Sequence, residues 1–107
     1  MITSTVEAQS VTATHLVVTD DTLTVELSDG RSIAVPLAWY PRLLHGTVDE
    51  RGRWQLIGRG IGIHWPDLDE DISVGSLLAG RMTVESPQSF QRWLGHRPIA
   101  EVPPTTA

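Results

Sequence analysis

Hydrophobic and polar residues alternate along the first half of the chain, and this pattern predicts β-strands. In residues 22–28, and again in residues 32–37, aliphatic residues occupy every second position, as in strands with one buried and one solvent-exposed face. The β-branched and apolar segment 15–19 precedes them, so the three segments predict an antiparallel meander. Asp29 and Gly30 predict a two-residue type I′ turn between the last two strands, which requires positive φ at both central positions.

Proline and glycine indicate short helices after the meander. Pro41 suits the first turn of a helix, where the missing backbone N–H is not needed. We therefore expect a helix over residues 41–45 that ends at the following glycine and directs Leu43 and Leu44 inward. A further helical turn is expected over residues 48–51.

Two more strands and a helix are expected further along the chain. Residues 54–58 and 60–65 have the composition of strands, and the glycines in this region permit a tight turn or a bulge. Residues 74–79 predict a helix that Asp71 or Ser73 caps, because a side-chain oxygen there accepts hydrogen bonds from the free N–H groups of the first turn.

The last predicted helix carries an apolar stripe. Ser86 caps it, a proline takes its first position, and Phe90, Trp93 and Leu94 share one face. Such a stripe on a short helix suits packing against its own domain or against a second copy of the chain. A homodimer through this helix therefore stays open.

These elements predict an α+β fold. A three-stranded meander and a further hairpin would make a small, mostly antiparallel sheet, accompanied by two or three short helices. The segments at both ends of the chain lack periodicity. We therefore expect a single domain over residues 13–95, with a flexible amino-terminal segment over residues 1–12 and a flexible proline-rich tail over residues 96–107.

Composition excludes several functions and narrows the partners. The absence of cysteine excludes disulfides, zinc–thiolate sites and cysteine nucleophiles. Eight scattered arginines, no lysine and thirteen carboxylates give a net charge of -5, which disfavours direct nucleic-acid binding. An acidic surface suits a basic protein partner, or simply solubility. No secretory signal is visible, and no apolar run reaches the ~18 residues of a membrane span, so we expect a cytoplasmic protein.

Three ordered blocks of the sequence resemble a known bacterial family. Residues 29–43, residues 54–58, and residues 62–72 with 77–80 are similar to the bacterial domain of unknown function 2442 at matching spacing, over about residues 14–80. The resemblance implies a small α+β domain and no established activity. Family members are often encoded beside another small gene, in layouts similar to toxin–antitoxin pairs. Some continue into a helix-turn-helix DNA-binding domain, but this chain has room for only one helix there.

A histidine and four carboxylates lie together around the end of the last predicted strand. They are His64, Asp67, Asp69, Glu70 and Asp71. The three aspartates have the spacing that opens a calcium loop, but that loop needs a glycine and a glutamate where this chain has Ile72 and Leu78. A magnesium site with few protein ligands stays open, whereas helix capping already accounts for two of the carboxylates. We expect no metal ion and no other cofactor.

Catalysis is an alternative use of this segment. His64 with Asp67 or Asp69 is the best candidate for a general acid–base pair, which would make the protein a small acid–base or metal-dependent hydrolase. A histidine that ends a strand is more often a structural hydrogen-bonding residue. Ser76 lacks the second glycine of a nucleophile elbow. An enzyme is therefore the second choice.

Tryptophan is abundant for so small a chain, and its four positions differ in context. Trp54 and Trp65 fall within predicted strands, so we expect them in the core. Trp39, Tyr40 and Arg42 lie in a connection and are the residue types that dominate protein interfaces, so we expect them on the surface.

Charge, the aromatic connection and the resemblance together predict a non-enzymatic protein-interaction or regulatory module. It would be the acidic member of a bacterial two-protein system, of an antitoxin-like kind, with a basic partner encoded by a neighbouring gene. The expected partner-binding residues are Trp39, Tyr40, Arg42, Asp67, Asp69, Glu70 and Asp71. For Arg42, an ion pair with Asp67 or Asp69 is an equally open structural role. A component of a DNA-binding regulator is a third alternative, which the negative charge disfavours.

Overall fold

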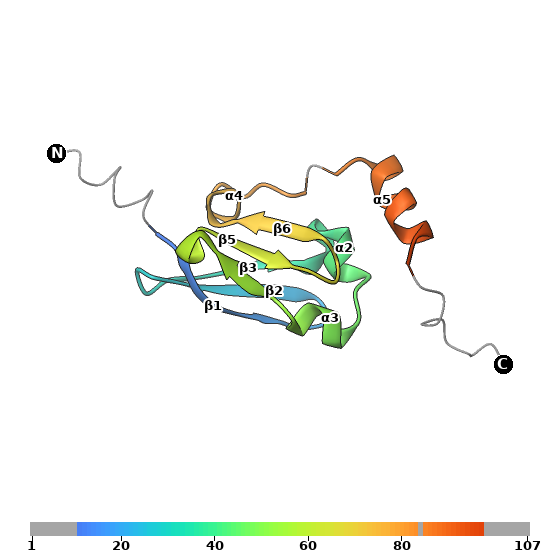
Figure 1. Ribbon diagram of the computed structural model, residues 1–107. Helices are drawn as coiled ribbons and strands as arrows, with labels where there is room; N and C mark the ends of the chain where they lie inside the picture. Colours follow the sequence, from blue (N-terminus) through green and yellow to red (C-terminus); the bar gives the residue numbers. More distant parts are fainter. Residues whose placement is uncertain (1–10, 84, 98–107) are drawn as a thin grey trace.

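Two three-stranded antiparallel sheets enclose the core of the protein (Figure 1). The computed structural model describes residues 11–83 and 85–97. The first sheet has the order β1-β2-β3, made of Ala13–Val18, Thr22–Leu27 and Ser32–Pro36. The second sheet has the order β4-β5-β6, made of Gln55–Ile57, Gly62–Trp65 and Glu70–Ser73. Residues of both sheets belong to one buried cluster, so the two sheets face each other. The α+β prediction is confirmed.

The predicted meander is confirmed, but its second turn differs from the expectation. Leu27 N–H donates to the carbonyl of Arg31 at 2.8 Å, and Gly30 N–H donates to the carbonyl of Leu27 at 3.1 Å, so three residues form the loop. Gly30 has a φ of +94°, whereas Asp29 does not adopt a positive φ. The predicted two-residue type I′ turn is therefore wrong, because glycine alone supplies the left-handed conformation.

The glycine turn between β4 and β5 brings the two sheets together. Gly58–Gly60 forms a 3-10 turn, η2, in which all three residues have positive φ. A Cβ on Gly60, whose φ is +95°, would lie 2.4 Å from the carbonyl oxygen of Ala13. Only glycine therefore allows this turn to approach the start of β1. The predicted tight turn is confirmed.

The acidic segment that we expected to cap a helix is instead the edge strand β6. It pairs with β5 so that Glu70 lies opposite Trp65, and Asp71 lies opposite His64. Glu70 and Ile72 are buried, whereas the residues that follow each of them are exposed. The segment therefore has the two-residue period of a strand with one buried face, although only one of its buried residues is apolar.

Two serines cap the helices that follow the sheets. Ser73 caps helix α4 (Val74–Leu78). The alternative prediction, a cap by Asp71, is wrong because Asp71 lies inside β6. Ser86 caps helix α5 (Pro87–Gly95), as predicted. Each serine hydroxyl accepts a hydrogen bond from the backbone N–H three residues on, which satisfies one of the free donors at the helix start.

Three short helical segments connect the sheets. They are the 3-10 turn η1 (Leu37–Trp39), α2 (Pro41–Leu44) and α3 (Val48–Gly52), and the last two confirm the predicted helices. Leu43 is fully buried, whereas Leu44 is 38% exposed, so only one of the two leucines points inward.

We expected Trp54 and Trp65 in the core, and the structure buries the second completely and the first in part. Trp65 is fully buried, and its indole N–H donates to the carbonyl of Arg51 at 3.0 Å. Trp54 is half-buried: it packs against the core and lies edge-on to His15, with 5.6 Å between the ring centroids. Their neighbours in the core include Leu16, Leu23, Val25, Ile63 and Leu68.

Helix α5 lies beside α2 at one end of the molecule (Figure 1). Phe90 lies edge-on to His45, with 5.1 Å between the ring centroids. The guanidinium groups of Arg42 and Arg97 lie over the ring of Trp93, at 5.1 and 4.9 Å from its centroid. The apolar stripe of α5 therefore contacts its own domain.

Most of the two predicted flexible ends, residues 1–10 and 98–107, lies outside the described residues. Within the described ranges, no helix has both the length and the apolar character that a membrane span requires.

Candidate functional site

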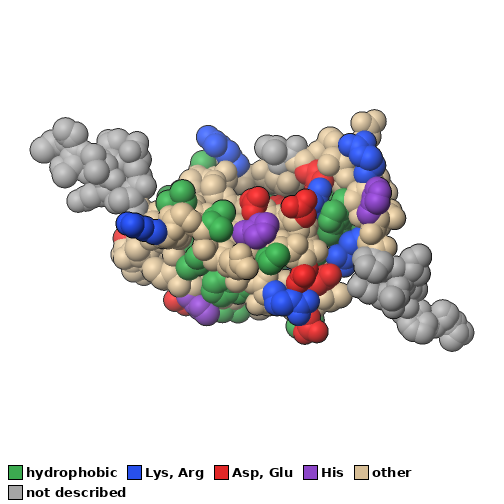
Figure 2. Space-filling view, in the orientation of Figure 1, with side chains coloured by type: hydrophobic (Ala, Val, Ile, Leu, Met, Phe, Trp, Pro, Cys, Tyr) green, Lys and Arg blue, Asp and Glu red, His purple; other side chains and the backbone are tan. Residues whose placement is uncertain are grey.

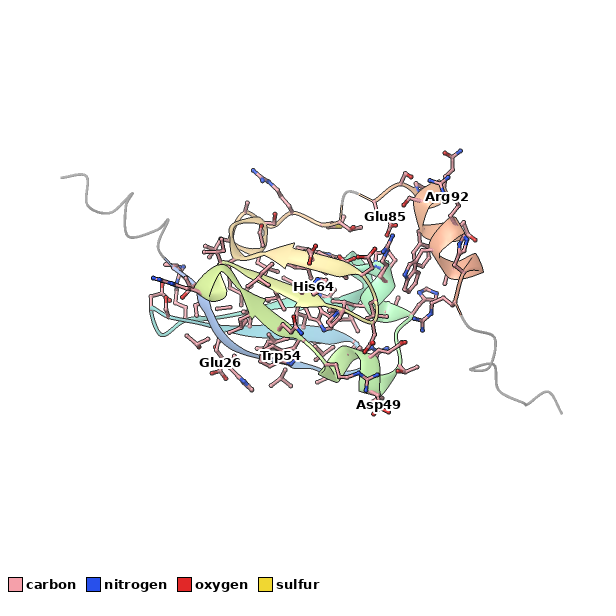
Figure 3. All side chains as sticks on the ribbon, viewed as in Figure 1. Glu26, Asp49, Trp54, His64, Glu85 and Arg92 are labelled. Carbon is pink, nitrogen blue, oxygen red and sulfur yellow. The ribbon has the colours of Figure 1, made fainter. Side chains whose placement is uncertain are left out.

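His64 and Asp71 form a pair on the outer face of the second sheet. They occupy opposite positions in β5 and β6, and His64 Nδ1 lies 2.5 Å from Asp71 Oδ1. Directly opposite side chains of antiparallel strands are nearest neighbours, so the strand register creates this pair. Figure 3 shows His64 near the middle of the sheet. The expected pairing of His64 with Asp67 or Asp69 is not formed.

Asp67 and Asp69 lie in the turn between β5 and β6 and have separate arginine partners. Arg53 Nε lies 2.6 Å from Asp67 Oδ2. Asp69 has a φ of +52°, its side chain is 85% exposed, and its Oδ2 lies 3.6 Å from Nη1 of Arg42. The hydrolase hypothesis requires His64, Asp67 and Asp69 to meet at one reaction centre. Each of them instead has a different partner, so they do not converge.

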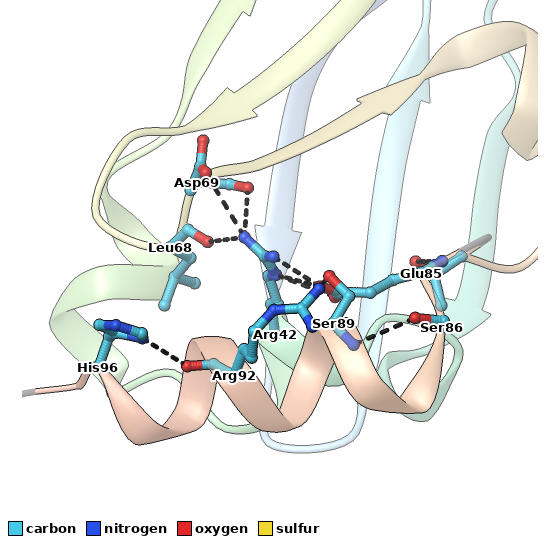
Figure 4. A network of polar contacts seen from close by, with 9 residues as sticks. Arg42, Leu68, Asp69, Glu85, Ser86, Ser89, Arg92 and His96 are labelled. Atoms are coloured by element: carbon cyan, nitrogen blue, oxygen red, sulfur yellow. Dashed lines mark hydrogen bonds and ion pairs between the residues drawn. The ribbon is translucent and has the colours of Figure 1, made fainter.

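Arg42 connects the turn before β6 with the segment before α5 (Figure 4). Its Nε lies 2.9 and 3.1 Å from the two carboxylate oxygens of Glu85, and its Nη2 lies 2.5 Å from one of them. Its Nη1 donates to the carbonyls of Leu68 and Asp69, at 3.3 and 3.0 Å. The arginine side chain is only 14% exposed. The predicted ion pair with Asp69 is therefore present, but the principal partner is Glu85.

The other two residues of the predicted aromatic surface are not freely exposed. Tyr40 is 3% exposed, and its hydroxyl donates to the carbonyl of Arg81 at 3.0 Å. Trp39 is half-buried and packs against the core. The expectation that Tyr40 lies on the surface is wrong, because the chain between α4 and α5 crosses over it.

Glu70 is a buried carboxylate beside two hollows. The residue is 9% exposed, and no described residue donates a hydrogen bond to its side chain. The inner hollow, about 120 Å³, lies between β6 and residues 81–83, and Tyr40 and Ser76 line it as well. The outer hollow, about 320 Å³, is lined by Glu70 together with Arg42, Asp69, Asp71, Glu85 and Ser89. Glu70 thus belongs to both.

Burial raises the pKa of the Glu70 carboxyl from its ordinary value of 4.5 to about 7. The guanidinium of Arg42 opposes this effect, whereas the nearby carboxylates of Glu85, Asp71 and Asp69 raise the pKa further. In contrast, the hydrogen bonds from Arg42 hold the pKa of Glu85 below its ordinary value, against a smaller effect of burial. Glu85 and Glu70 line the same hollow, but only Glu85 has its charge neutralised by hydrogen bonds from Arg42.

A carboxylate of this kind can bind a cation or exchange a proton. The histidine that the sequence suggested for acid–base catalysis, His64, lines neither hollow. Across the described ranges, no group of three histidine or acidic side chains is arranged to hold a metal ion. The arrangement provides a single buried carboxylate beside a hollow that is lined by further acidic residues.

Exposed carboxylates lie at the outer hollow and in the turn before β6. The side chains of Asp69 and Asp71 are 85% and 66% exposed, and that of Asp67 is 38% exposed. In the orientation of Figure 1, Figure 2 shows acidic side chains beside a histidine near the middle of the visible face. A negative surface around a buried carboxylate raises the local concentration of cations.

Three of the residues that sequence reasoning missed come from the chain after α4. Arg81 and Thr83 line the inner hollow, and Glu85 binds Arg42. Their positions in the sequence do not predict that they lie next to β6. They come close to this strand only because of the path that the chain takes between α4 and α5. Glu85 lies 43 residues from its arginine.

Comparison with known proteins places the domain in a family. The family model described as "Protein of unknown function (DUF2442)" matches residues 13–83, a region that ends before α5. No curated protein matches the chain.

Two solved structures are similar to the chain. The crystal structure of a protein of unknown function from Rhodospirillum rubrum ATCC 11170 has 26% identity and a TM-score of 0.61, over 71% of this chain and 94% of that chain. The solution NMR structure of an uncharacterised protein from Chromobacterium violaceum has 16% identity and a TM-score of 0.62, over 83% of this chain and 82% of that chain. Because the sequence identity to the second protein is only 16%, this similarity shows a shared fold and nothing more.

Proposed function

The chain belongs to the DUF2442 family of proteins of unknown function, and we propose that its domain is a non-enzymatic protein-interaction module that binds a cationic segment of a protein partner. The observation that carries this proposal is the Glu70 carboxylate, which is buried, has no hydrogen-bond donor among the described residues, and faces hollows with an acidic rim.

The charges around the hollows favour a cationic partner. Asp69 and Asp71 are exposed, and the nearest arginine to Asp69, Arg42, already gives its best hydrogen bonds to Glu85. The chain as a whole carries a net charge of -5. Complementary charge speeds the encounter of two proteins and selects the correct partner, so a basic segment would be attracted to this face.

An interaction role also fits the arrangement of the catalytic candidates better than a hydrolase does. His64 is bound to Asp71 on the outer face, whereas Asp67 and Asp69 have arginine partners in the turn. A hydrolase built on these residues would require two of them to meet at a substrate. We therefore keep the interaction module as the single proposal.

The partner that we propose is the basic member of a two-protein system, encoded by the neighbouring gene, with this chain in an antitoxin-like role. The gene-pair part of this proposal rests on what the family resemblance implies. The acidic rim and the unpaired Glu70 provide the physical support for a basic partner.

Co-expression with the product of the neighbouring gene tests the proposal. We expect the two proteins to co-purify, and the complex to weaken as salt increases. The double variant Asp69→Asn/Asp71→Asn should weaken the measured affinity by about tenfold. The matched control is Asp20→Asn/Glu26→Gln, which removes the same charge from exposed residues that line neither hollow. Failure to co-purify at low salt, or an equal loss in the control, would overturn the proposal.

A further inference from the structure

The inner hollow has the features of a socket for one side chain. It is more enclosed than the outer hollow, and its volume of about 120 Å³ has room for a few water molecules or a single side chain. Glu70 provides a carboxylate, and Ile72 and Met82 provide apolar wall. An aliphatic stem with a charged end would match both parts of this lining.

Glu70 is the group in this hollow that lacks a partner. The residue is more than nine-tenths buried, and none of the described residues hydrogen-bonds to its side chain. No side-chain oxygen that is sealed from solvent lacks a partner in the described ranges, so the Glu70 oxygens reach the hollow. Buried carboxylates are normally paired, and one that faces a cavity without a donor points to a donor supplied by a ligand.

Three hydroxyl groups line the same hollow and can accept hydrogen bonds. Tyr40 donates its own proton to the carbonyl of Arg81, which leaves its oxygen free to accept. The Ser76 hydroxyl accepts a hydrogen bond from the Ser73 hydroxyl, and the Thr83 hydroxyl accepts one from the backbone N–H of Glu85. Both hydroxyl oxygens keep a second lone pair that can accept another hydrogen bond. A ligand with several donors on one compact centre fits this set of acceptors.

We propose that the inner hollow binds the ammonium group of a lysine side chain from the protein partner, with Glu70 as the counter-charge and the stem of the lysine along Ile72 and Met82. This assignment rests on the proposed function, because it names the partner group that enters the site. An ammonium group has three donors around a single point charge, whereas a guanidinium is a broad planar fork whose five donors lie in one plane.

None of the 107 residues can supply the lysine. The sequence contains no lysine at any position, so no side chain within it can supply an ammonium group. Of its arginines near the site, Arg42 is occupied by Glu85, and Arg81, which lines the inner hollow, makes no hydrogen bond or ion pair to Glu70. Among the described residues, the Glu70 carboxylate therefore has no donor.

The socket should work better above neutral pH than below it. The charged and titratable groups that face Glu70 from the surrounding elements are Tyr40, Arg42, Asp69, Asp71, Arg81 and Glu85. Burial raises the pKa of the Glu70 carboxyl to about 7, whereas a lysine ammonium remains charged throughout this range. Lowering the pH from 8 to 5.5 should therefore weaken binding by about thirtyfold.

NMR of the full chain with labelled glutamate carboxyls tests the socket directly. The probe is Nα-acetyl-lysine amide, and Nα-acetyl-norleucine amide has the same stem without the charge. We expect a saturable shift of the Glu70 carboxyl with a dissociation constant on the order of 1–10 mM at pH 8. The norleucine probe should cause no such shift. No saturable shift with the lysine probe at pH 8, or no weakening at pH 5.5, would overturn the assignment.

Two further probes separate the possible sources of the cation. Nα-acetyl-arginine amide should bind at least fivefold more weakly than the lysine probe, and equal binding would contradict the ammonium assignment. Pentylamine, a free amine with a similar stem and the same single charge, should bind no more tightly than the lysine probe. Tighter binding of pentylamine would point to a small amine as the occupant and would contradict a partner lysine.

Glu70→Gln and Asp67→Asn form the matched pair of variants. Both remove one charge from the acidic face, but only Glu70 lines the hollows. We expect at least a tenfold loss of lysine-probe binding in E70Q, followed at the Tyr40 and Ser76 signals, and less than a twofold loss in D67N. The pH dependence of the native chain gives an independent answer if E70Q does not fold.

The same variants distinguish the socket from the proposed function. If the partner protein binds the native chain and E70Q equally, the socket assignment is wrong while the interaction module stands. If the lysine probe binds at Glu70 but no partner protein co-purifies, the hollow binds an ammonium group, but the proposed interaction module and the assignment to a partner lysine are wrong. We expect the partner to bind E70Q at least tenfold more weakly than D67N.

Discussion

Arg42 and Glu70 line the same hollow, yet Arg42 directs its hydrogen bonds to Glu85 and leaves the Glu70 carboxylate without a donor. Two opposite charges thus lie close together without forming a bonded pair. The two glutamates therefore differ: Glu85 forms a structural ion pair with Arg42, whereas the Glu70 carboxylate has no donor among the described residues.

The stability of the native chain should fall as pH rises through neutrality. The folded-state pKa of Glu70, about 7, lies above its ordinary value of 4.5, so the folded protein binds more protons between these values and stability is lost as pH rises. The loss should be roughly 2–3 kcal/mol between pH 5 and pH 8. Urea denaturation at intervals across this range measures it. E70Q should lack this component and be more stable than the native chain at pH 8, whereas the control Glu26→Gln should keep the native profile.

Acid should weaken the docking of α5. The pKa of Glu85 is lowered by the hydrogen bonds from Arg42, with burial in opposition, so its stabilising effect is present above the ordinary pKa of 4.5 and is lost as pH falls through the lower folded value. Trp93, which lies under the Arg42 guanidinium, provides a fluorescence signal for this change. Glu85→Gln should show the altered Trp93 signal already at pH 7. An unchanged acid profile in that variant would contradict the prediction.

Arg42 and Glu85 should be strongly coupled in stability. Their side chains are 14% and 11% exposed, so removing one charge leaves the other with little solvent. Arg42→Gln or Glu85→Gln alone should cost about 2–4 kcal/mol, and the double variant should cost less than the sum by about 1–3 kcal/mol. Urea denaturation of all four proteins measures the coupling. Additive effects would mean that the pair contributes no more than two independent residues.

Trp93 should hold α5 on the domain without holding the sheets together. Its ring lies under two guanidinium groups and next to Phe90, at 5.7 Å between ring centroids. In Trp93→Ala, the amide protons of residues 87–95 should exchange about ten- to a hundredfold faster, while those of the strands change less than threefold. Gln91→Ala, on the exposed side of the same helix, is the control. Equal acceleration in the strands would show that α5 belongs to the core.

Gly60→Ala should destabilise the contact between the two sheets. The new Cβ would lie 2.4 Å from the carbonyl oxygen of Ala13, at a backbone φ of +95°, so both a clash and a strained conformation result. We expect a loss of about 2–4 kcal/mol in urea denaturation. Gly75→Ala is the control, because a Cβ there meets nothing within 4 Å. That substitution lies in helix α4 and should be neutral or stabilise the protein by up to about 1 kcal/mol.

Local patterns predicted the first sheet more completely than the second. In β2, three aliphatic residues alternate with polar ones and all three are buried, so period and composition agree. In β6, Ile72 is the single apolar residue between acidic and polar neighbours. A four-residue strand with one apolar position carries too weak a period to be recognised, and its carboxylates resemble helix caps.

The candidate site was predicted as a region but not as a set of contacts. Glu70 was among the expected partner-binding residues, and it lies in the hollows, whereas Tyr40 is buried under residues of the chain after α4. The pairing of His64 with Asp71 depends on the register between β5 and β6. A shift of one residue in that register would have placed different side chains together.

By itself, the sequence determined the meander, the serine cap of the last helix and the presence of an acidic segment, because alternation and capping depend on residues within a few positions of each other. Only the tertiary structure decided which carboxylate is neutralised. Arg42 meets Glu85 across 43 residues, and this long-range contact leaves Glu70 as the buried carboxylate that still lacks a donor among the described residues. Charge alone could not distinguish the two glutamates, since burial and hydrogen bonding depend on how the chain packs.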